Sequence, residues 1–455
     1  MKTLILLIVL FLTQTLRAQT ATAPTGGDGT SGSPYQIASL ENLYWIASDV
    51  TRWDKYYIQT ANIDASSTST WFTNGSGGYY GWIPIGNTAT KFTGTYNGNG
   101  KTISGIYINR PLIDNVGLLG YTSGAAISNV GLVGGSVVGQ NYIGGLVGFN
   151  DGYSTIDNSY NRGTVSGYSQ IGGLVGNNYN GTISKSYNTG TIGNGIITTS
   201  GSYYVGGLVG HNHLGNINNC YNSGNIDGGY WGVGGLVGYN NTDGGIVDKC
   251  YSTGHISAYP DRDPTHGLYR FGGLVGDCCS GPVYDSYWDI ETSGTTSSPS
   301  GQGTGKTTTE MKTQSTFNGW DFTTVWEIIG TNYPRLKSNP DPALEIEAEA
   351  NLLPTEFALI QNYPNPFNPA TVISYQLPVY SFITLKVYDV LGNEVAVLVN
   401  EEKQPGTYEL EFQSAISSRQ LSSGVSAKGG YASGVYFYQL RAGNFVQMKK
   451  MIVLK

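Results

Sequence analysis

Apolar residues recur along the middle of this chain at a fixed distance. The pentapeptide Gly-Gly-Leu-Val-Gly occurs five times, and a related Val-Gly-Leu-Leu-Gly precedes it. Their central leucines are Leu118, Leu146, Leu174, Leu208, Leu236 and Leu274. The steps between them are 28, 28, 34, 28 and 38 residues, a base period of 28 with insertions of 6 and 10. Such a period indicates stacked structural repeats, each contacting only its neighbours.

Three further columns appear when the repeats are aligned. They contain Ile127, Ile156, Ile183, Ile217, Val247 and Val283; then Tyr160, Tyr187, Tyr221, Tyr251 and Tyr287; then Val165, Ile192, Ile226 and Ile256. Each repeat therefore predicts about three short strands, which bury too little to be stable alone. Pairing each strand with its counterpart one repeat on, at roughly 4.8 Å, would close a continuous core. We predict an all-β fold in which residues 111–292 form a right-handed parallel β-helix, one repeat per turn.

The flanks of the repeats predict end structures. Residues 19–34 are rich in Gly, Thr and Ser and are expected to be a flexible leader. Apolar residues at near-helical spacing in 35–49 predict an amphipathic helix that covers the open end of the solenoid. Short β-prone runs at 57–58, 82–85, 92–96 and 103–108 predict irregular first coils, so 35–110 becomes the N-terminal cap. The aromatic residues of 293–338 predict a C-terminal cap.

The last hundred residues have a different pattern. Alternating apolar positions at 371–376, 383–388, 408–412, 435–440 and 445–453 predict longer strands and an antiparallel β-sandwich over 356–455. The acidic, Pro-bearing stretch 339–355 predicts the linker between the two parts.

Composition and the first residues bear on location. Residues 1–18 predict a secretory signal, with Lys2 before an apolar run and Ala18 before the cleavage site. A buried N-terminal strand is the alternative, and the run is too short to span a bilayer. We expect no transmembrane segment elsewhere. Only 12% of the 455 residues are charged, the net charge is −7 and no basic stripe is present. We therefore expect no nucleic-acid partner. We also expect a monomer.

A second repeated element, Ser/Cys-Tyr-Asn-x-Gly, follows the pentapeptide, most clearly within 158–163, 185–190 and 219–224. Together the two elements resemble the GLUG motif of bacterial surface proteins. The resemblance covers about 111–292. It implies a β-solenoid of the kind found in adhesin-like proteins and in the stalks of some secreted peptidases, and it implies a scaffold without implying a reaction.

The C-terminal segment carries another resemblance. Its residues are Asn362, Tyr363, Pro364, Asn365, Pro366 and Phe367 at the start, Gly392 in the middle, Gly434, Val435 and Tyr436 later, and Lys449, Lys450 and Lys455 at the end. They are similar to the type A C-terminal sorting domain of the type IX secretion system. The resemblance implies an Ig-like domain that the secretion machinery binds, export through the periplasm, and later removal. Ser-Gly-Val occurs at 423–425 and again at 433–435, which predicts a longer loop and leaves the hairpin register open.

Candidate chemistry is sparse. Cys220 and Cys250 take the place of a serine column in adjacent coils, so they either form a disulfide or fill the core as two buried thiols. His211 and His213 could ligate a metal, but we favour a solvent-facing turn and expect no metal and no cofactor. Neither a His-Glu-x-x-His helix nor a Gly-x-Ser-x-Gly elbow is present.

Two sets of residues remain as functional candidates. Asp157 and Asp248 share a column three coils apart, and Asp261 and Asp263 share an insertion. Paired carboxylates would suit a glycosidase. The alternative is that these acidic residues simply lie on solvated turns. The insertions at 193–204 and 257–270 follow the same strand and should lie on one edge. We predict ligand binding there by aromatic rings, the alternative being that they shield the core. The set is Tyr203, Tyr204, Tyr230, Trp231, Tyr259 and Tyr269.

Together these patterns predict an exported β-solenoid, at the cell surface or released. We expect it to act as an adhesin-like binding protein for a glycan, matrix or protein ligand. A polysaccharide lyase or glycoside hydrolase and a structural surface spacer are the alternatives, so enzymatic activity stays open.

Overall fold

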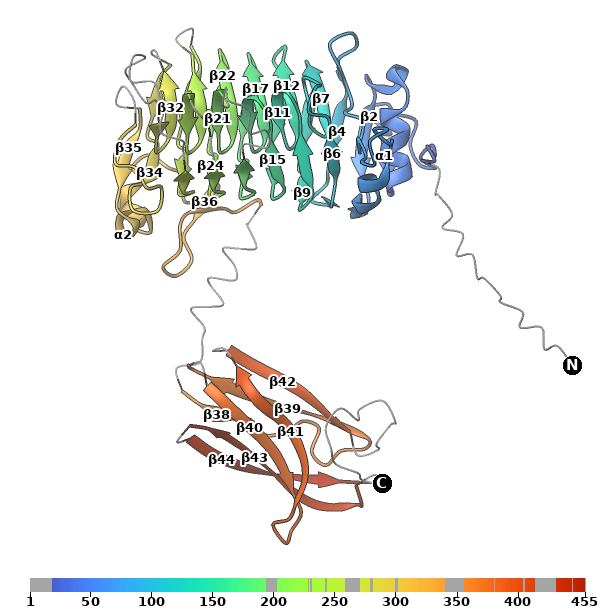
Figure 1. Ribbon diagram of the computed structural model, residues 1–455, viewed down its shortest axis with the longest axis vertical. Coiled ribbons are helices and arrows are strands. Elements are labelled where there is room, and N and C mark those ends of the chain that lie inside the picture. The colour runs from blue at the N-terminus through green and yellow to red at the C-terminus, as the bar shows by residue number, and fades with distance from the viewer. Residues whose placement is uncertain are drawn as a thin grey trace, which may run out of the picture. The chain divides into compact units, whose positions relative to one another are not determined.

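The computed structural model describes residues 19–454, except 194–202, 228, 230, 242–243, 258–270, 279–280, 299–301, 340–355, 380, 404–405, 414–430 and 444. The predicted signal sequence, Lys455 and nearly all of the predicted linker lie outside the described residues. Two compact units are present, Met1–Asp341 and Pro342–Lys455. The first is a solenoid of stacked parallel sheets, and the second consists of antiparallel sheets (Figure 1).

Each complete coil of the solenoid contains five strands where about three were predicted. The coil from 141 to 166 is typical, with β11 (Asn141–Gly144), β12 (Val147–Asp151), β13 (Thr155–Asp157), β14 (Tyr160–Asn161) and β15 (Thr164–Ser166). The additional strands arise because the Gly-Gly-Leu step bends the chain and separates two strands that the sequence joins.

Five parallel sheets result, each named here after its strand in this coil. The β11 sheet also contains β16 (Ser169–Gly172), β21 (Tyr203–Gly206), β26 (Trp231–Gly234) and β31 (Phe271–Gly272). The β12 sheet also contains β7 (Leu119–Ser123), β17 (Val175–Tyr179), β22 (Val209–His213), β27 (Val237–Asn240) and β32 (Val275–Cys278).

The other three sheets complete the wall. The β13 sheet adds β1 (Tyr35–Ile37), β2 (Tyr56–Gln59), β4 (Thr95–Asn97), β8 (Ala126–Ser128), β18 (Thr182–Ser184), β23 (Asn216–Asn218), β28 (Ile246–Asp248) and β33 (Val283–Tyr284). The β14 sheet adds β3 (Ile63–Asp64), β5 (Thr102–Ser104), β9 (Gly131–Val133), β19 (Tyr187–Asn188), β24 (Tyr221–Asn222), β29 (Tyr251–Ser252), β34 (Tyr287–Asp289) and β35 (Thr304–Lys306). The β15 sheet adds β6 (Tyr107–Asn109), β10 (Ser136–Val138), β20 (Ile192–Gly193), β25 (Ile226–Asp227) and β30 (Ile256–Ser257).

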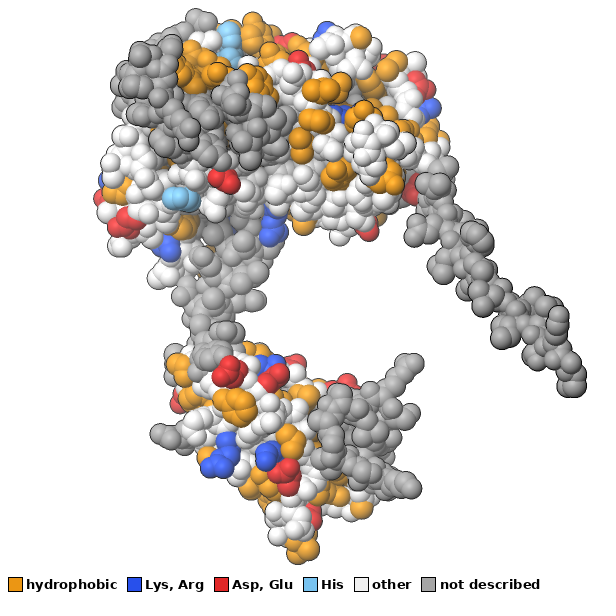
Figure 2. Space-filling model, in the orientation of Figure 1, with side chains coloured by type: hydrophobic (Ala, Val, Ile, Leu, Met, Phe, Trp, Pro, Cys, Tyr) orange, Lys and Arg blue, Asp and Glu red, His pale blue; other side chains and the backbone are white. Residues whose placement is uncertain are grey.

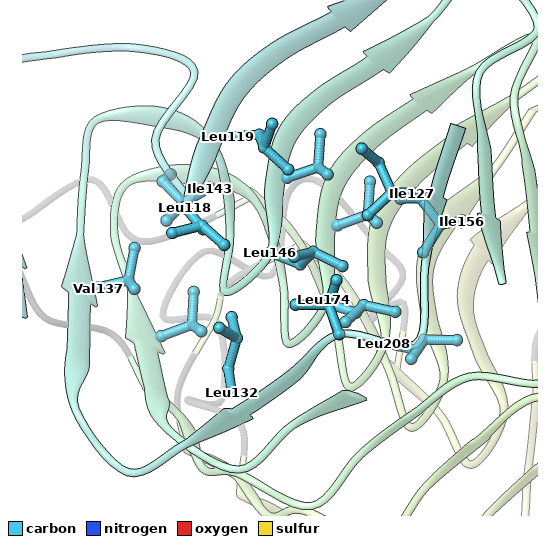
Figure 3. Close-up of a cluster of buried hydrophobic side chains, with 14 of the residues drawn as sticks. Leu118, Leu119, Ile127, Leu132, Val137, Ile143, Leu146, Ile156, Leu174 and Leu208 are labelled. Carbon is cyan, nitrogen blue, oxygen red and sulfur yellow. The ribbon is translucent and has the colours of Figure 1, made fainter. Parts of the chain in front are cut away.

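The predicted columns are confirmed as ladders. Ile156 pairs with Ile183, and Tyr187 pairs with Tyr221, each one coil further along. The six leucines are all buried, and Figure 3 shows Leu118, Leu146, Leu174 and Leu208 following one another inside the solenoid. The paired glycines before each leucine leave no room for a side chain, since a Cβ on Gly173 would lie 2.3 Å from the carbonyl oxygen of Gly207. This close approach explains why the pentapeptide repeats unchanged.

Buried asparagines form a second inner ladder. The side-chain amide of Asn150 donates to Oδ1 of Asn178 at 2.8 Å, Asn178 donates to Asn212 at 2.9 Å, and Asn212 donates to Asn240 at 2.9 Å. All four residues are fully buried. Each amide thus bonds to the next, and within the described residues only Nδ2 of Asn240, at the end of this ladder, is left without a partner in it.

The N-terminal end is closed by a helix that is shorter than predicted. Residues 35–37 form β1, and α1 (Leu40–Ala47) begins after Ser39, whose side chain accepts from the amide of Asn42. Leu43 and Ile46 are buried in the core at the blue end of Figure 1. The stretch 19–34, expected to be a flexible leader, instead bonds to this cap, since Thr22 N donates to Glu41 O at 3.1 Å.

The first coils are irregular, as predicted. The predicted run 57–58 lies in β2 and 103–108 divides into β5 and β6, whereas 82–85 makes only isolated bridges. Two short 3₁₀ helices, Val50–Arg52 and Ser66–Thr70, connect these elements.

The predicted C-terminal cap is a strap along one side of the solenoid. This C-terminal strap, residues 304–339, contains β35, α2 (Thr308–Met311), a 3₁₀ turn (Gln314–Thr316), β36 (Trp326–Glu327) and β37 (Arg335–Leu336). It covers the stacked tyrosines of the β14 sheet, and β36 lies beside β24 in Figure 1. Its end returns to an earlier coil, because Ser338 Oγ donates to Oδ1 of Asn158 at 2.7 Å.

The second unit contains two antiparallel sheets. One is β38 (Ala358–Leu359), β39 (Ala370–Leu377) and β42 (Gly406–Gln413); the other is β41 (Glu394–Lys403), β40 (Ser381–Tyr388), β43 (Gly434–Ala442) and β44 (Phe445–Val453). The β43–β44 hairpin runs in unbroken register from Gly434↔Val453 to Ala442↔Phe445. The repeated Ser-Gly-Val therefore leaves this register intact.

Candidate functional site

The residue directly after each Gly-Gly-Leu-Val-Gly faces outward from the β12 sheet. It alternates with the residue that follows it, so Phe149 is half-buried while Asn150 is fully buried. In-register pairing places these outward residues in one ladder across the coils. The ladder is Tyr121, Phe149, Asn177, His211, Tyr239 and Asp277.

A second row of side chains joins this ladder from the β11 sheet. Tyr142, Gln170 and Tyr204 occupy equivalent positions within β11, β16 and β21, with φ values of 59°, 53° and 55°. This left-handed conformation is uncommon for residues other than glycine. It brings the ring of Tyr142 to 5.2 Å from that of Phe149, and the ring of Tyr204 to 4.8 Å from that of Tyr239.

The rings form one connected surface. Phe149 stacks on Tyr121 at 4.7 Å, Tyr179 lies 4.8 Å from His213, and His211 lies 5.0 Å from Tyr239. All are half-buried, so each presents part of its ring to solvent. We name this set the outer aromatic stripe: Tyr121, Tyr142, Phe149, Tyr179, Tyr204, His211, His213 and Tyr239. Figure 2 shows hydrophobic side chains among polar ones over the face where β7, β12 and β17 are labelled in Figure 1.

The stripe is electrically neutral at His211 and Tyr121. Burial, with a smaller effect of nearby His213, lowers the pKa of His211 to about 4. Its Nδ1 lies 3.2 Å from both Asn177 Nδ2 and Gln170 Oε1. Burial and the neighbouring Asp151 carboxylate raise the pKa of Tyr121 to about 12. Neither side chain is charged at neutral pH.

Three of the six predicted aromatic residues are described. Tyr203 and Trp231 are register partners in adjacent coils, and Tyr203 has 38% of its surface exposed. Tyr204 turns onto the outer aromatic stripe, and Trp231 Nε1 donates to Asp277 Oδ2 at 2.9 Å. The other three, Tyr230, Tyr259 and Tyr269, lie outside the described residues. The predicted row of rings along the insertion edge therefore stays a prediction.

The histidine prediction is wrong in its local structure. His211 and His213 lie in strand β22 and not in a solvent-facing turn, because the tripeptide continues the outward and inward alternation of the β12 sheet. In the described ranges, no group of three or more His, Cys, Asp or Glu side chains gathers where it could hold a metal ion.

The carboxylates proposed for catalysis are separated. Asp157 and Asp248 belong to one ladder, with two coils between them, so they stand about 14 Å apart at the usual strand spacing. Each pairs with the lysine of a neighbouring corner: Lys185 with Asp157 at 3.2 Å and Lys249 with Asp248 at 2.9 Å. Asp261 and Asp263 lie outside the described residues.

The two stacked cysteines are free thiols in the structure. Cys220 Sγ donates to Asn218 O at 3.2 Å, and Cys250 Sγ donates to Asp248 O at 3.1 Å. The backbone N–H of Cys220 points to Cys250 Sγ at 3.4 Å. Of the two predicted alternatives, a disulfide or two buried thiols, the structure contains the two buried thiols.

The opening motif of the second unit is bound to its last strand. Asn365 Oδ1 accepts from Ile452 N at 2.8 Å, and Asn365 Nδ2 donates to Lys450 O at 3.2 Å. Phe367 N donates to Ile452 O at 3.0 Å, while Leu454 N donates back to Phe367 O. The two most distant parts of the predicted sorting signal thus form a single structure.

The outer aromatic stripe escaped the sequence reasoning because its column is not uniform. Successive coils place Tyr, Phe, Asn, His and Tyr at the same position, so aligned identity gives no signal there. The signal lay in position instead: the residue following each pentapeptide is followed in four coils by a buried asparagine, so within the strand it faces outward.

Comparison with known proteins identifies both parts of the chain. The GLUG motif matches at 139–166, 167–193, 201–227 and 229–257, and a secretion system C-terminal sorting domain matches at 361–454. None of the helices in the described part of the chain combines the length and apolar character needed to cross a bilayer.

Similar proteins share only part of their length with this chain. Halomucin of Haloquadratum walsbyi is 40% identical over 125 residues, which is 27% of this chain and 1% of that protein. A Gly-rich membrane protein of Evansella cellulosilytica is 39% identical over 108 residues, or 22% of this chain and 11% of that protein. Among solved structures, an IgA1 protease matches with a TM-score of 0.37 and 18% identity, over 56% of this chain and 19% of that one.

Proposed function

We propose that this chain is an adhesin-like binding protein whose outer aromatic stripe holds an extended carbohydrate. Its GLUG motifs support a surface protein, and its type IX C-terminal sorting domain indicates export to the cell surface or extracellular space. One observation carries the proposal: half-buried rings follow one another without a break from β7 to β27.

The geometry of the stripe suits a linear polymer. Its main ladder advances one coil at a time, at roughly 4.8 Å, so it offers a regular row of contacts along the solenoid axis. Sugar rings present C–H faces that stack on aromatic side chains, and each such contact adds roughly 0.5–1.5 kcal/mol, by analogy with aromatic pairs. Gln170, beside the rings, is half-buried and supplies an amide that can bond to hydroxyls, while the buried Asn177 donates to it and holds it in place.

The low charge of the stripe favours a neutral ligand. His211 is uncharged at neutral pH, and no lysine or arginine belongs to the set. Binding should therefore depend little on salt, because screening acts on interactions between charges.

The test is attachment to a glycan array, paired with an assay for reducing-sugar release. Replacing Tyr179 and Tyr239 by Ala together should weaken binding roughly tenfold or more, if each ring contributes about 0.7 kcal/mol or more. Tyr153→Asn is the matched control, since Tyr153 is 80% exposed, lies in a turn beyond β12 and has a φ of 62° that Asn tolerates. Equal binding by both variants, with folds intact, would favour the surface spacer.

Sugar release would instead favour the enzymatic alternative. A glycosidase needs two carboxyl groups about 5–10 Å apart. The described Asp157 and Asp248 do not meet that requirement, and both are engaged by lysines. Binding without release is the expected outcome.

A further inference from the structure

A hollow lies where the C-terminal strap crosses the β13 sheet. It measures about 460 Å³, and its floor is formed by outward-facing residues of β18, β23 and β28. Thr182, Asn216 and Ile246 are register partners there, and Asn218 pairs with Asp248 beside them. Gly319, Asp321 and Val325 of the strap form the opposite wall. The hollow therefore exists only because the strap folds back over the solenoid.

The strap has a second hollow of about 600 Å³ that shares Gly319 with the first. Phe317, Trp320 and Phe322 line it, but Phe317 and Trp320 are buried and only the ring of Phe322 is half-buried, while Gln314 and Asn318 contribute amides. Gly319 has a φ of 77°, so the chain bends sharply between the two hollows. The two hollows adjoin at this residue, and both have linings of mixed polar and apolar character.

The hollow between the strap and the β13 sheet offers neutral hydrogen-bonding groups. The side chain of Asn216 is exposed and that of Thr182 is half-buried, and the two are register partners. The charges around them are already engaged. Lys249 Nζ lies 2.9 Å from Asp248 Oδ2, and the Asp321 carboxylate accepts from Thr323 N at 2.8 Å and Thr324 N at 2.9 Å. An ionic ligand would have to break one of these interactions.

The backbone around the hollow excludes a peptide strand as occupant. A peptide adds to a sheet through unpaired N–H and C=O groups at an edge. Strand β23 lies between β18 and β28, and β28 between β23 and β33, so neither presents an edge. A nucleic acid would need a cationic surface, but the one lysine in the lining is paired with Asp248.

We propose that this seam between the strap and the solenoid binds an uncharged oligosaccharide at a site separate from the outer aromatic stripe. Amide and hydroxyl groups of neighbouring coils take the sugar hydroxyls, and the half-buried ring of Phe322 takes a sugar face. Because the seam belongs to the β13 sheet and the strap, whereas the stripe belongs to the β11 and β12 sheets, each site can be altered alone.

The test uses the full chain and a panel of neutral oligosaccharides, namely glucans, galactans, mannans and xylans, with sulfated and uronic-acid counterparts. Asn216→Trp fills the seam. Thr155→Trp is its matched control, because Thr155 occupies the same ladder outside the lining. We expect Asn216→Trp to weaken binding of at least one neutral oligosaccharide tenfold or more, at low and high salt alike. Thr155→Trp should bind as the unaltered protein does.

The paired Tyr179→Ala and Tyr239→Ala change separates the two sites. The seam ligand should remain bound in that variant, whatever happens to ligands of the stripe. Binding lost only in the stripe variant would overturn the seam site and leave the stripe standing. Three other results would also overturn the proposal. They are a loss of binding in Asn216→Trp that is confined to acidic glycans, an equal loss of binding in both tryptophan variants, and the failure of the unaltered protein to bind any neutral oligosaccharide.

Discussion

The backbone N–H of Leu146 donates to the carbonyl oxygen of Leu174 at 3.0 Å, although 28 residues separate them. The same bond joins Leu174 to Leu208, where the separation is 34. The six additional residues are therefore absorbed outside the ladder. Position in the coil, and not distance along the chain, fixes what each leucine contacts.

Shortening one leucine of this ladder should destabilise the solenoid. Leu208 is fully buried, so Leu208→Ala removes apolar contacts and leaves a cavity, at a cost of roughly 2–5 kcal/mol in the free energy of unfolding. Urea unfolding measures the change. Leu112→Ala should alter stability by less than about 0.5 kcal/mol, because Leu112 is 81% exposed. Similar losses in both variants would contradict the inward ladder.

The asparagine ladder should be equally sensitive. Asn178→Ala deprives Asn150 of its acceptor and Asn212 of its donor, and both amides are fully buried. Two unpaired buried groups should cost about 2–5 kcal/mol, measured by thermal or urea unfolding. Asn216→Ala is the comparison, since Asn216 is exposed. Its stability should barely change.

Acid should weaken the fold through His211. Its pKa is lowered in the folded state to about 4, so the unfolded chain takes up a proton first as the pH falls. The stabilising contribution is complete above about 6.5 and is lost between that pH and about 4, reaching at most about 3 kcal/mol. His211→Gln cannot titrate. The stability difference between the two proteins should therefore change with pH across this window, and a constant difference would refute the assignment.

Export should depend on the second unit. Deleting 356–455 should leave a folded solenoid in the periplasm, because the two units have separate cores. Cell fractionation, with limited proteolysis to verify folding, measures this. Normal delivery of the shortened protein to the surface would count against a sorting role. The resemblance also predicts that the mature surface form lacks this domain, which mass spectrometry can check.

A smaller change should test how the sorting domain is built. Asn365→Ala removes two hydrogen bonds between the opening motif and β44 and should lower both domain stability and the exported fraction. Asn368→Ala, in the same motif, changes an exposed residue and should export normally. If the two variants behave alike, the link to β44 has no part in export.

Sequence periodicity predicted the columns well because stacking turns a repeated residue into a ladder. Ile156, Tyr187 and Leu208 each have the partner expected one coil away. It underestimated the strands per coil because some corners carry ordinary residues at positive φ, such as Lys185 between β18 and β19 and Lys249 between β28 and β29. These residue types give no turn signal, unlike glycine.

Features that depend on distant contacts were less accessible. The strap lies along the tyrosine ladder because Trp326 Nε1 bonds to Asn219 Oδ1, 107 residues earlier. Strand β41 escaped prediction because it is an edge strand carrying Glu394, Glu401 and Glu402, so it lacks a strongly buried face. Both depend on the assembled neighbours and leave little local pattern.

The constant register across the insertions has a consequence for how such a chain changes over generations. Because each coil pairs in the same way with the next, gain or loss of one repeat-length segment by duplication or deletion could leave the remaining coils in place. Each such event would lengthen or shorten the molecule by roughly 4.8 Å and add or remove one outward position after a pentapeptide. The length of the solenoid would thus change by whole coils in single genetic events.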